Sequence, residues 1–121
     1  LTPMVELAYL SGCEMTECPV LGGVVPLHDE NMRTTNKDVY IAGDISGVEE
    51  ASTAMEEGRL AGVSAAEALG YLATADAEAK KQEIRDRLKL LRSGQFGQRR
   101  ADAKKTIEDT YRQRTEGGEP A

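Results

Sequence analysis

The chain is poor in aromatic residues and has no long apolar run. It contains no Trp, four Tyr and one Phe. No stretch approaches the ~20 apolar residues that cross a bilayer, and no charged segment followed by an apolar one stands at its start. We therefore expect a modest core, a cytoplasmic location and no membrane partner.

Basic residues are scarce in the first part of the chain. Residues 1–71 hold 3 basic and 12 acidic side chains, whereas residues 72–121 hold 12 basic and 9 acidic ones. Nucleic-acid binding needs clustered Lys and Arg, and in the second part the basic residues are interspersed with acids. We expect no nucleic-acid partner, and two segments of different character that meet near Tyr71.

Side chains for metal or redox chemistry are few. Cys13 and Cys18 are separated by four residues; we interpret them as ordinary reduced thiols, with a redox or metal role as the alternative. His28 is the single histidine, and its pKa of about 6.5 would suit proton transfer, although a surface or capping histidine is the more frequent case. The sequence therefore names no metal ligand and no catalytic residue.

Short elements are expected before residue 43. Proline suits the first turn of a helix, and a Gly-Gly pair suits a hairpin turn. The expected elements are a helix from Pro3 to near Gly12, a hairpin over Cys18–Pro26 that turns at Gly22-Gly23, a polar loop over Leu27–Asp38, and a strand over Val39–Ala42.

A helix rich in Ala and Glu is expected next, from Glu49 or Glu50 to about Leu69. Two internal glycines, Gly58 and Gly62, each cost about 1 kcal/mol relative to alanine. Because small residues recur at intervals of three and four, close packing is expected to offset this cost. The acidic residues are interpreted as a solvated face and not as catalytic acids: Glu49, Glu50, Glu56 and Glu57.

Two further amphipathic helices are expected within residues 72–115, with a turn at Ser93–Gly97. We predict a helical hairpin whose thin apolar stripe docks on a parent enzyme, another subunit or a second copy. A solvated tail with partial helicity is the alternative. Residues 116–121 are expected to be disordered. The stripes are Ile84, Leu88 and Leu91 in one helix, and Ile107 and Tyr111 in the other.

The most informative segment runs from Asp38 to Gly47. A short β-branched and aromatic run ends at Gly43-Asp44, and the helix begins close by. Such a turn presents one carboxylate and free backbone N–H groups, which can hold a ribityl chain, a phosphate or a polarised carbonyl. A Gly-Asp pair at a strand end is also common as a plain turn in which the Asp caps the next helix.

The segment from Thr34 to Ala66 resembles the C-terminal FAD-binding motif of the pyridine nucleotide-disulfide oxidoreductase superfamily. That pattern is a Thr, a short apolar strand, Gly-Asp, and a helix with Ala and Gly at set offsets. Leu1-Thr2-Pro3 is similar to the x-x-Pro turn of the family. Residues around Gly22-Gly23 and Gly47–Ser52 are most similar to its amine and amino-acid dehydrogenase branch, such as the sarcosine oxidase alpha and hydrogen cyanide synthase flavoproteins. The resemblance covers residues 1 to about 71.

The resemblance implies FAD as the cofactor of a full-length parent and allows NAD(P) as a second nucleotide. It implies that Gly43 leaves room for the cofactor and that Asp44 accepts a hydrogen bond from a ribityl hydroxyl or a bound water. It also implies that the backbone N–H groups of Ala51, Ser52 and Thr53 face the pyrimidine edge of the flavin.

A complete enzyme of this family also needs a G-x-G-x-x-G motif, which is missing here. At roughly 100–200 residues per domain, 121 residues are too few for two nucleotide-binding domains. We therefore interpret the chain as an α+β fragment, mainly α. It would comprise the last strand and helix of a Rossmann-like FAD-binding domain in residues 1–71, followed by the helical hairpin.

The predicted function is the C-terminal part of an FAD-dependent oxidoreductase that transfers hydride between a substrate or NAD(P)H and FAD. The isolated fragment is expected to be inactive, with the remainder of the flavoenzyme as its partner. The unpaired edge of the Val39–Ala42 strand predicts self-association. The alternative is a small α-rich interaction module without catalysis.

Overall fold

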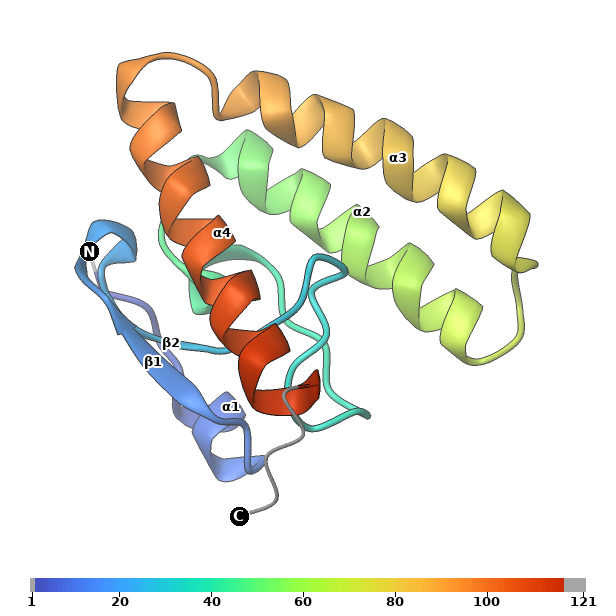
Figure 1. The fold of residues 1–121 in the computed structure, drawn as a ribbon, viewed down its shortest axis with the longest axis horizontal. Coiled ribbons are helices and arrows are strands. Elements are labelled where there is room, and N and C mark those ends of the chain that lie inside the picture. Colours follow the sequence, from blue (N-terminus) through green and yellow to red (C-terminus); the bar gives the residue numbers. More distant parts are fainter. Residues whose placement is uncertain (1, 117–121) are drawn as a thin grey trace.

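Three long helices, a short hairpin beside the last of these helices and an irregular segment make up the computed structural model, which describes residues 2–116 (Figure 1). Within this part of the chain the structure is mainly helical, with one two-stranded sheet. The elements are α1 (Glu6–Leu10), β1 (Met15–Cys18), the 3-10 turn η1 (Pro19–Leu21), β2 (Gly23–Pro26), the 3-10 turn η2 (Gly43–Ser46), α2 (Ala51–Ala68), α3 (Thr74–Leu91) and α4 (Gln95–Glu116).

The hairpin begins earlier than the sequence predicts. Strands β1 and β2 are antiparallel, with Met15 opposite Pro26 and Cys18 opposite Gly23. The residues between the strands form η1, which closes at Gly22 with φ +105°. Pro19 has no N–H to donate to a ladder, so it begins a 3-10 turn where the sequence predicted strand.

The strand predicted over Val39–Ala42 is not formed. Tyr40 makes one isolated bridge with Arg33, and Ile41 N donates to Met32 O at 3.0 Å. A strand needs an extended neighbour along its length, but here the neighbouring segment turns at Met32, whose φ is +67°. The strand prediction is therefore wrong for this chain, although the Gly-Asp turn that follows it is present as η2.

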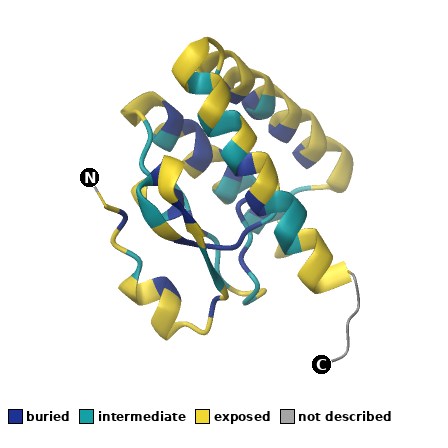
Figure 2. Ribbon diagram, turned by 60° about the vertical axis from the view of Figure 1, so that its left-hand side comes forward, coloured by how far each residue is buried: buried dark blue, intermediate teal, exposed yellow. Residues whose placement is uncertain are grey.

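Helices α2 and α3 lie side by side in opposite directions (Figure 1). Helix α3 has a narrow buried stripe and a broad exposed face, whereas most residues of α2 are buried or half-buried (Figure 2). This packing positions the N-terminus of α2 beside η2, which it contacts. The buried apolar cluster between the helices and the irregular segment consists of Met32, Ile41, Leu60, Ile84 and Leu88.

Helix α4 turns away from α3 and does not form the predicted hairpin with it (Figure 1). The corner is tight, since a Cβ at Gly97 would lie 2.5 Å from the carbonyl carbon of Arg92. The apolar stripe of α3 packs on α2 and that of α4 on the region around η1, so each finds a partner within the chain. Glu116, which was predicted to begin a disordered tail, instead ends α4. The rest of that predicted tail, residues 117–121, lies outside the described residues.

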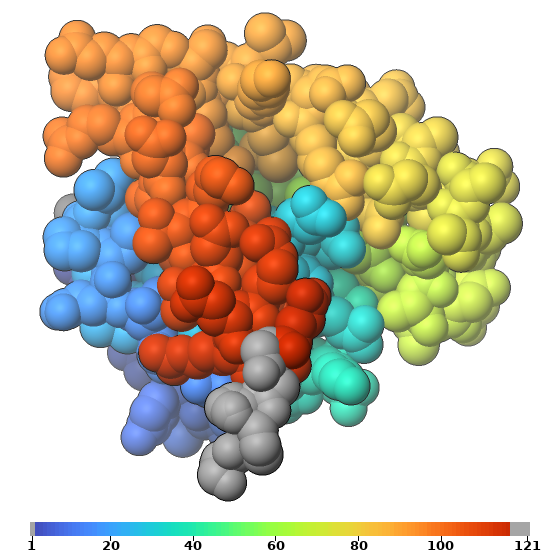
Figure 3. Space-filling model, viewed as in Figure 1, coloured from blue at the N-terminus to red at the C-terminus, as the bar shows by residue number. Residues whose placement is uncertain are grey.

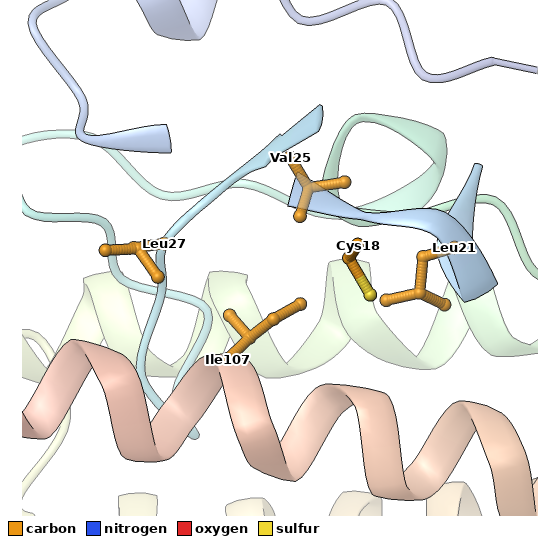
Figure 4. Close-up of a cluster of buried hydrophobic side chains, with 5 residues drawn as sticks. All are labelled: Cys18, Leu21, Val25, Leu27 and Ile107. Atoms are coloured by element: carbon orange, nitrogen blue, oxygen red, sulfur yellow. The ribbon is translucent and has the colours of Figure 1, made fainter. Parts of the chain in front are cut away.

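The second apolar cluster holds α4 against the hairpin (Figure 4). Ile107 of α4 is 2% exposed, and it contacts side chains from β1, η1, β2 and the residue that follows β2. Helix α4 is therefore docked along its middle and is not a solvated tail. The cluster consists of Cys18, Leu21, Val25, Leu27 and Ile107.

Replacing Ile107 with alanine is expected to lower the free energy of unfolding by about 2–5 kcal/mol, because it removes buried methyl groups and leaves a cavity. Urea-induced unfolding followed by circular dichroism measures this. Leu90→Ala, at an exposed position on α3, is the control and should change stability by about 0.5 kcal/mol or less. Equal effects of the two substitutions would contradict the docking of α4.

Candidate functional site

The Gly-Asp pair lies in a tight turn pressed against α2. Gly43 has φ +83°, and a Cβ placed on it would lie 3.7 Å from the Cβ of Ala54. Ser46 Oγ donates to Gly43 O at 2.8 Å, which closes the turn. Gly47 ends it with φ +120°, at a point where a Cβ would lie 2.8 Å from Leu21. Only glycine meets both requirements at residue 47.

The predicted flavin-contacting residues come together at this turn. Asp44 is exposed, and its carboxylate accepts no hydrogen bond from any described residue. Ala51 and Ser52 are also exposed, whereas Thr53 is buried. No side chain caps the N-terminus of α2, whose first helical hydrogen bond ends on Glu50 O at 3.1 Å. The N–H groups of the three predicted residues therefore precede the helical ladder. Their role toward a flavin stays a prediction.

A buried carboxylate holds the turn from the inside. Glu57 is 1% exposed. Its Oε1 accepts from Gly43 N at 3.0 Å and lies 3.0 Å from Ser46 Oγ, whose single proton it shares with Gly43 O. Its Oε2 lies 2.9 Å from Arg92 Nη2 and 3.1 Å from Lys104 Nζ. The prediction that Glu57 belongs to a solvated face is wrong. It joins η2 and α2 to the corner after α3 and to α4.

The two cations are themselves held by further oxygens. Lys104 is buried and also donates to Ser46 O at 2.6 Å. Arg92 makes two hydrogen bonds to Glu49, at 2.9 and 2.8 Å. Burial alone would lower the pKa of the Arg92 guanidinium, but the hydrogen bonds and charge of Glu49 and the charge of Glu57 outweigh it and raise the pKa. The turn is thus held by a network of paired charges.

Two more glutamates differ from the sequence prediction. The Glu49 side chain is 3% exposed and that of Glu56 is 10% exposed. Glu56 pairs with Arg59 at 2.6 Å and with Arg87 at 2.9 Å. Buried charges are tolerated when they are paired and hydrogen-bonded. Arg92 and Arg87, which pair with Glu49 and Glu56, are far from them in the sequence, so the local pattern did not indicate these pairs. Only Glu50, whose side chain is 76% exposed, is solvated as predicted.

His28 is fully buried, which overturns its interpretation as a surface or capping residue. Its Nδ1 lies 3.1 Å from Pro26 O, and its Nε2 lies 3.4 Å from Lys104 Nζ. Because a carbonyl oxygen only accepts, Nδ1 carries the proton and Nε2 accepts from the lysine. Burial, and next the charge of Lys104, lower the pKa of His28 well below its ordinary value. The imidazole is therefore neutral.

Both cysteines are buried and free. Cys13 Sγ donates to Thr34 Oγ1 at 3.3 Å, and Cys18 lies in the apolar cluster of α4. Within residues 2–116, no group of three or more His, Cys, Asp or Glu side chains is arranged to hold a metal ion. In the same part of the chain, every helix is too short or too polar to cross a membrane.

The sequence did contain one signal for the buried carboxylate. Thr53, Glu57, Leu60 and Ser64 recur at intervals of four, three and four, and all are buried on one face of α2. A glutamate in register with such a stripe points inward. The pattern would have indicated a buried Glu57, but not which cations meet it.

Comparison with known proteins finds a relative among the oxidoreductases. An opine oxidase subunit from Agrobacterium tumefaciens (strain Ach5) is 33% identical to this chain over 72 residues, which is 60% of this chain and 14% of the relative. The chain is therefore similar to a small part of that oxidase protein. No protein-family model and no solved structure matches the chain.

Stability is expected to depend on His28 in mild acid. The unfolded chain binds a proton on this residue below about pH 6.5, whereas the folded chain does not, because its pKa is lowered. The free energy of unfolding should therefore fall by up to about 1.4 kcal/mol per pH unit from pH 6.5 downward.

His28→Asn is the matched variant, because its amide can donate to Pro26 O without titrating. Urea unfolding at several values between pH 5 and 7 should show a flatter acid limb for the variant. Parallel curves for the two proteins would contradict a depressed pKa of His28.

Proposed function

We propose that this chain is the C-terminal part of an FAD-dependent oxidoreductase and contributes the ribityl and pyrimidine side of its flavin site. NAD(P) is the second nucleotide that this proposal allows. The similarity to a small part of an oxidase protein supports the oxidoreductase class. The cofactor is inferred from the Gly-Asp motif and its surroundings.

The observation that carries the proposal is that the turn containing Asp44 contacts α2, with Gly43 next to Ala54 in the uncapped first turn of that helix. Glu57 takes up the inner face of the turn, so the exposed Asp44 carboxylate is left to accept a hydrogen bond from outside. Three backbone N–H groups precede the helical ladder next to it. One acceptor and several fixed donors match the ribityl hydroxyls and the pyrimidine carbonyls of a flavin.

The flavin, when bound, would supply the hydride chemistry. The protein residues would hold and tune it. Asp44 would accept a hydrogen bond from a hydroxyl of the cofactor, and Gly43 would keep the adjacent backbone free of a side chain. The N–H groups at Ala51, Ser52 and Thr53 stand at the positive end of an 18-residue helix, where negative charge on a nearby group is stabilised.

The exposed face of α2 supports the proposal that another part of the flavoenzyme packs against this helix. A Cβ at Gly58 or Gly62 would have no neighbour within 4 Å, so the close packing expected from the sequence is not found among the described residues. Met55 on the same helix and Leu69 at its end are both exposed. Packing against the remainder of the flavoenzyme would cover these positions and offset the two glycines.

Asp44→Ala, made in the complete flavoprotein, is expected to weaken FAD binding by roughly 10- to 100-fold, the cost of a lost hydrogen bond to a charged group. FAD retained after gel filtration and a fluorescence titration of the apoprotein measure this. Asp38→Ala, at an exposed position just before the turn, is the control. Unchanged flavin content in the Asp44 variant would overturn the assignment of this residue.

A second candidate is a non-catalytic interaction module, favoured by an apolar hollow at α1. This hollow has a volume of about 440 Å³ and is lined by side chains of α1, β1 and β2. Leu7 and Leu10 of α1 are each 77% exposed, and only Ala8 of that helix is buried. This surface, and not the edge of a strand at residues 39–42, is where self-association would occur.

The isolated chain is expected to form a dimer or larger assembly through α1, measured by light scattering across a wide concentration range. Leu7→Ser combined with Leu10→Ser should give a monomer, because the substitutions place hydroxyl groups in the apolar contact. Leu90→Ser combined with Leu91→Ser, on an exposed part of α3, should not. A monomeric wild-type chain at all concentrations would contradict the module.

A further inference from the structure

A cavity of about 510 Å³ lies between α3 and α4 and is separate from the proposed flavin contacts (Figure 3). Cavities that take small molecules are typically ~300–1,000 Å³. The two helices diverge from the corner at Gly94, and the space between them opens to solvent. Its floor includes Met32, Leu60 and Leu88, all of which belong to the apolar core.

Several cationic side chains in the walls of the cavity can form further hydrogen bonds or ion pairs. Among the described residues, Arg92 Nη1 has no hydrogen-bond acceptor and Lys89 has no ion pair. Lys105 has only a long contact with Asp109, at 3.9 Å. Arg85 Nε is buried without a partner within the described part of the chain. Some cationic N–H groups of the cavity therefore have no acceptor among the described residues.

Three carboxyl groups also line the cavity, but they do not pair with these remaining cationic groups. Glu57 already accepts four contacts from the network. Glu30 lies 3.9 Å from Arg85 and is mostly exposed. Burial, and then the charge of Glu30, raise the pKa of Glu108. The cationic side toward Arg92 therefore remains open to a ligand.

We propose that this cavity binds a small organic anion: a carboxylate beside Arg92, Lys89 and Lys105, with an apolar body of several carbons on the floor. A bare inorganic anion would leave the apolar floor uncovered. A neutral apolar molecule would leave the cations unpaired. The proposal does not depend on the flavin function.

The test is a titration of the whole chain with hexanoate, followed by amide chemical shifts and by calorimetry. Hexanoate should bind saturably and shift the amides of Gln98 and Ala101, which line the cavity. Inorganic phosphate and 1-hexanol, which each carry one half of the recognised chemistry, should bind at least about tenfold more weakly. Binding of phosphate or hexanol as tight as that of hexanoate would overturn the proposed ligand class.

A pair of double variants tests the location. Lys89→Gln with Lys105→Gln should weaken hexanoate binding about tenfold, while these exposed substitutions leave the fold intact. Lys37→Gln with Lys80→Gln changes the net charge equally at exposed positions outside the cavity and should leave binding unchanged. Equal weakening in both pairs, or no saturable binding by the wild type, would overturn the proposal.

Discussion

The buried carboxylate of Glu57 is the interaction on which the other parts depend. Taking one charge out of water costs several kcal/mol, and this cost is offset here by two cations, a hydroxyl and a backbone N–H. These partners come from η2, from the corner that follows α3, and from α4. If any one of these elements moves, a buried charge loses a partner, so their positions are mutually dependent.

This interior network explains why the outer side of the Gly-Asp turn is available. Glu57 and Lys104 hold the turn through Gly43 N, Ser46 Oγ and Ser46 O, and none of these contacts involves the side chain of Asp44. The cavity between α3 and α4 is lined by Glu57, Arg92 and Lys104 of the same network. The proposed flavin contacts and the proposed anion site are therefore neighbours linked by one carboxylate.

Local sequence patterns predicted which segments form helices and turns better than they predicted which of these elements pack on one another. Spacing of apolar residues indicated α3 and α4, the Ala- and Glu-rich composition indicated α2, and the Gly-Asp pair indicated the turn at η2. The strand over Val39–Ala42 was wrong, because its neighbour turns at Met32 and leaves only isolated bridges. The helical hairpin was wrong because the stripes of α3 and α4 pack on different parts of the chain. Periodicity shows which face of a helix is apolar, but not what that face meets.

The sequence by itself determined the helices, the turn with Asp44, and a resemblance that points to a flavin. Each of these depends on residues close together in the chain, whose preferences are local. The tertiary structure alone decided that Glu49, Glu56 and Glu57 are paired with arginine and lysine, that His28 is buried and neutral, and that a cationic cavity exists. The reason is physical: a charged side chain is buried only where distant residues supply its partners, and that depends on how the helices pack.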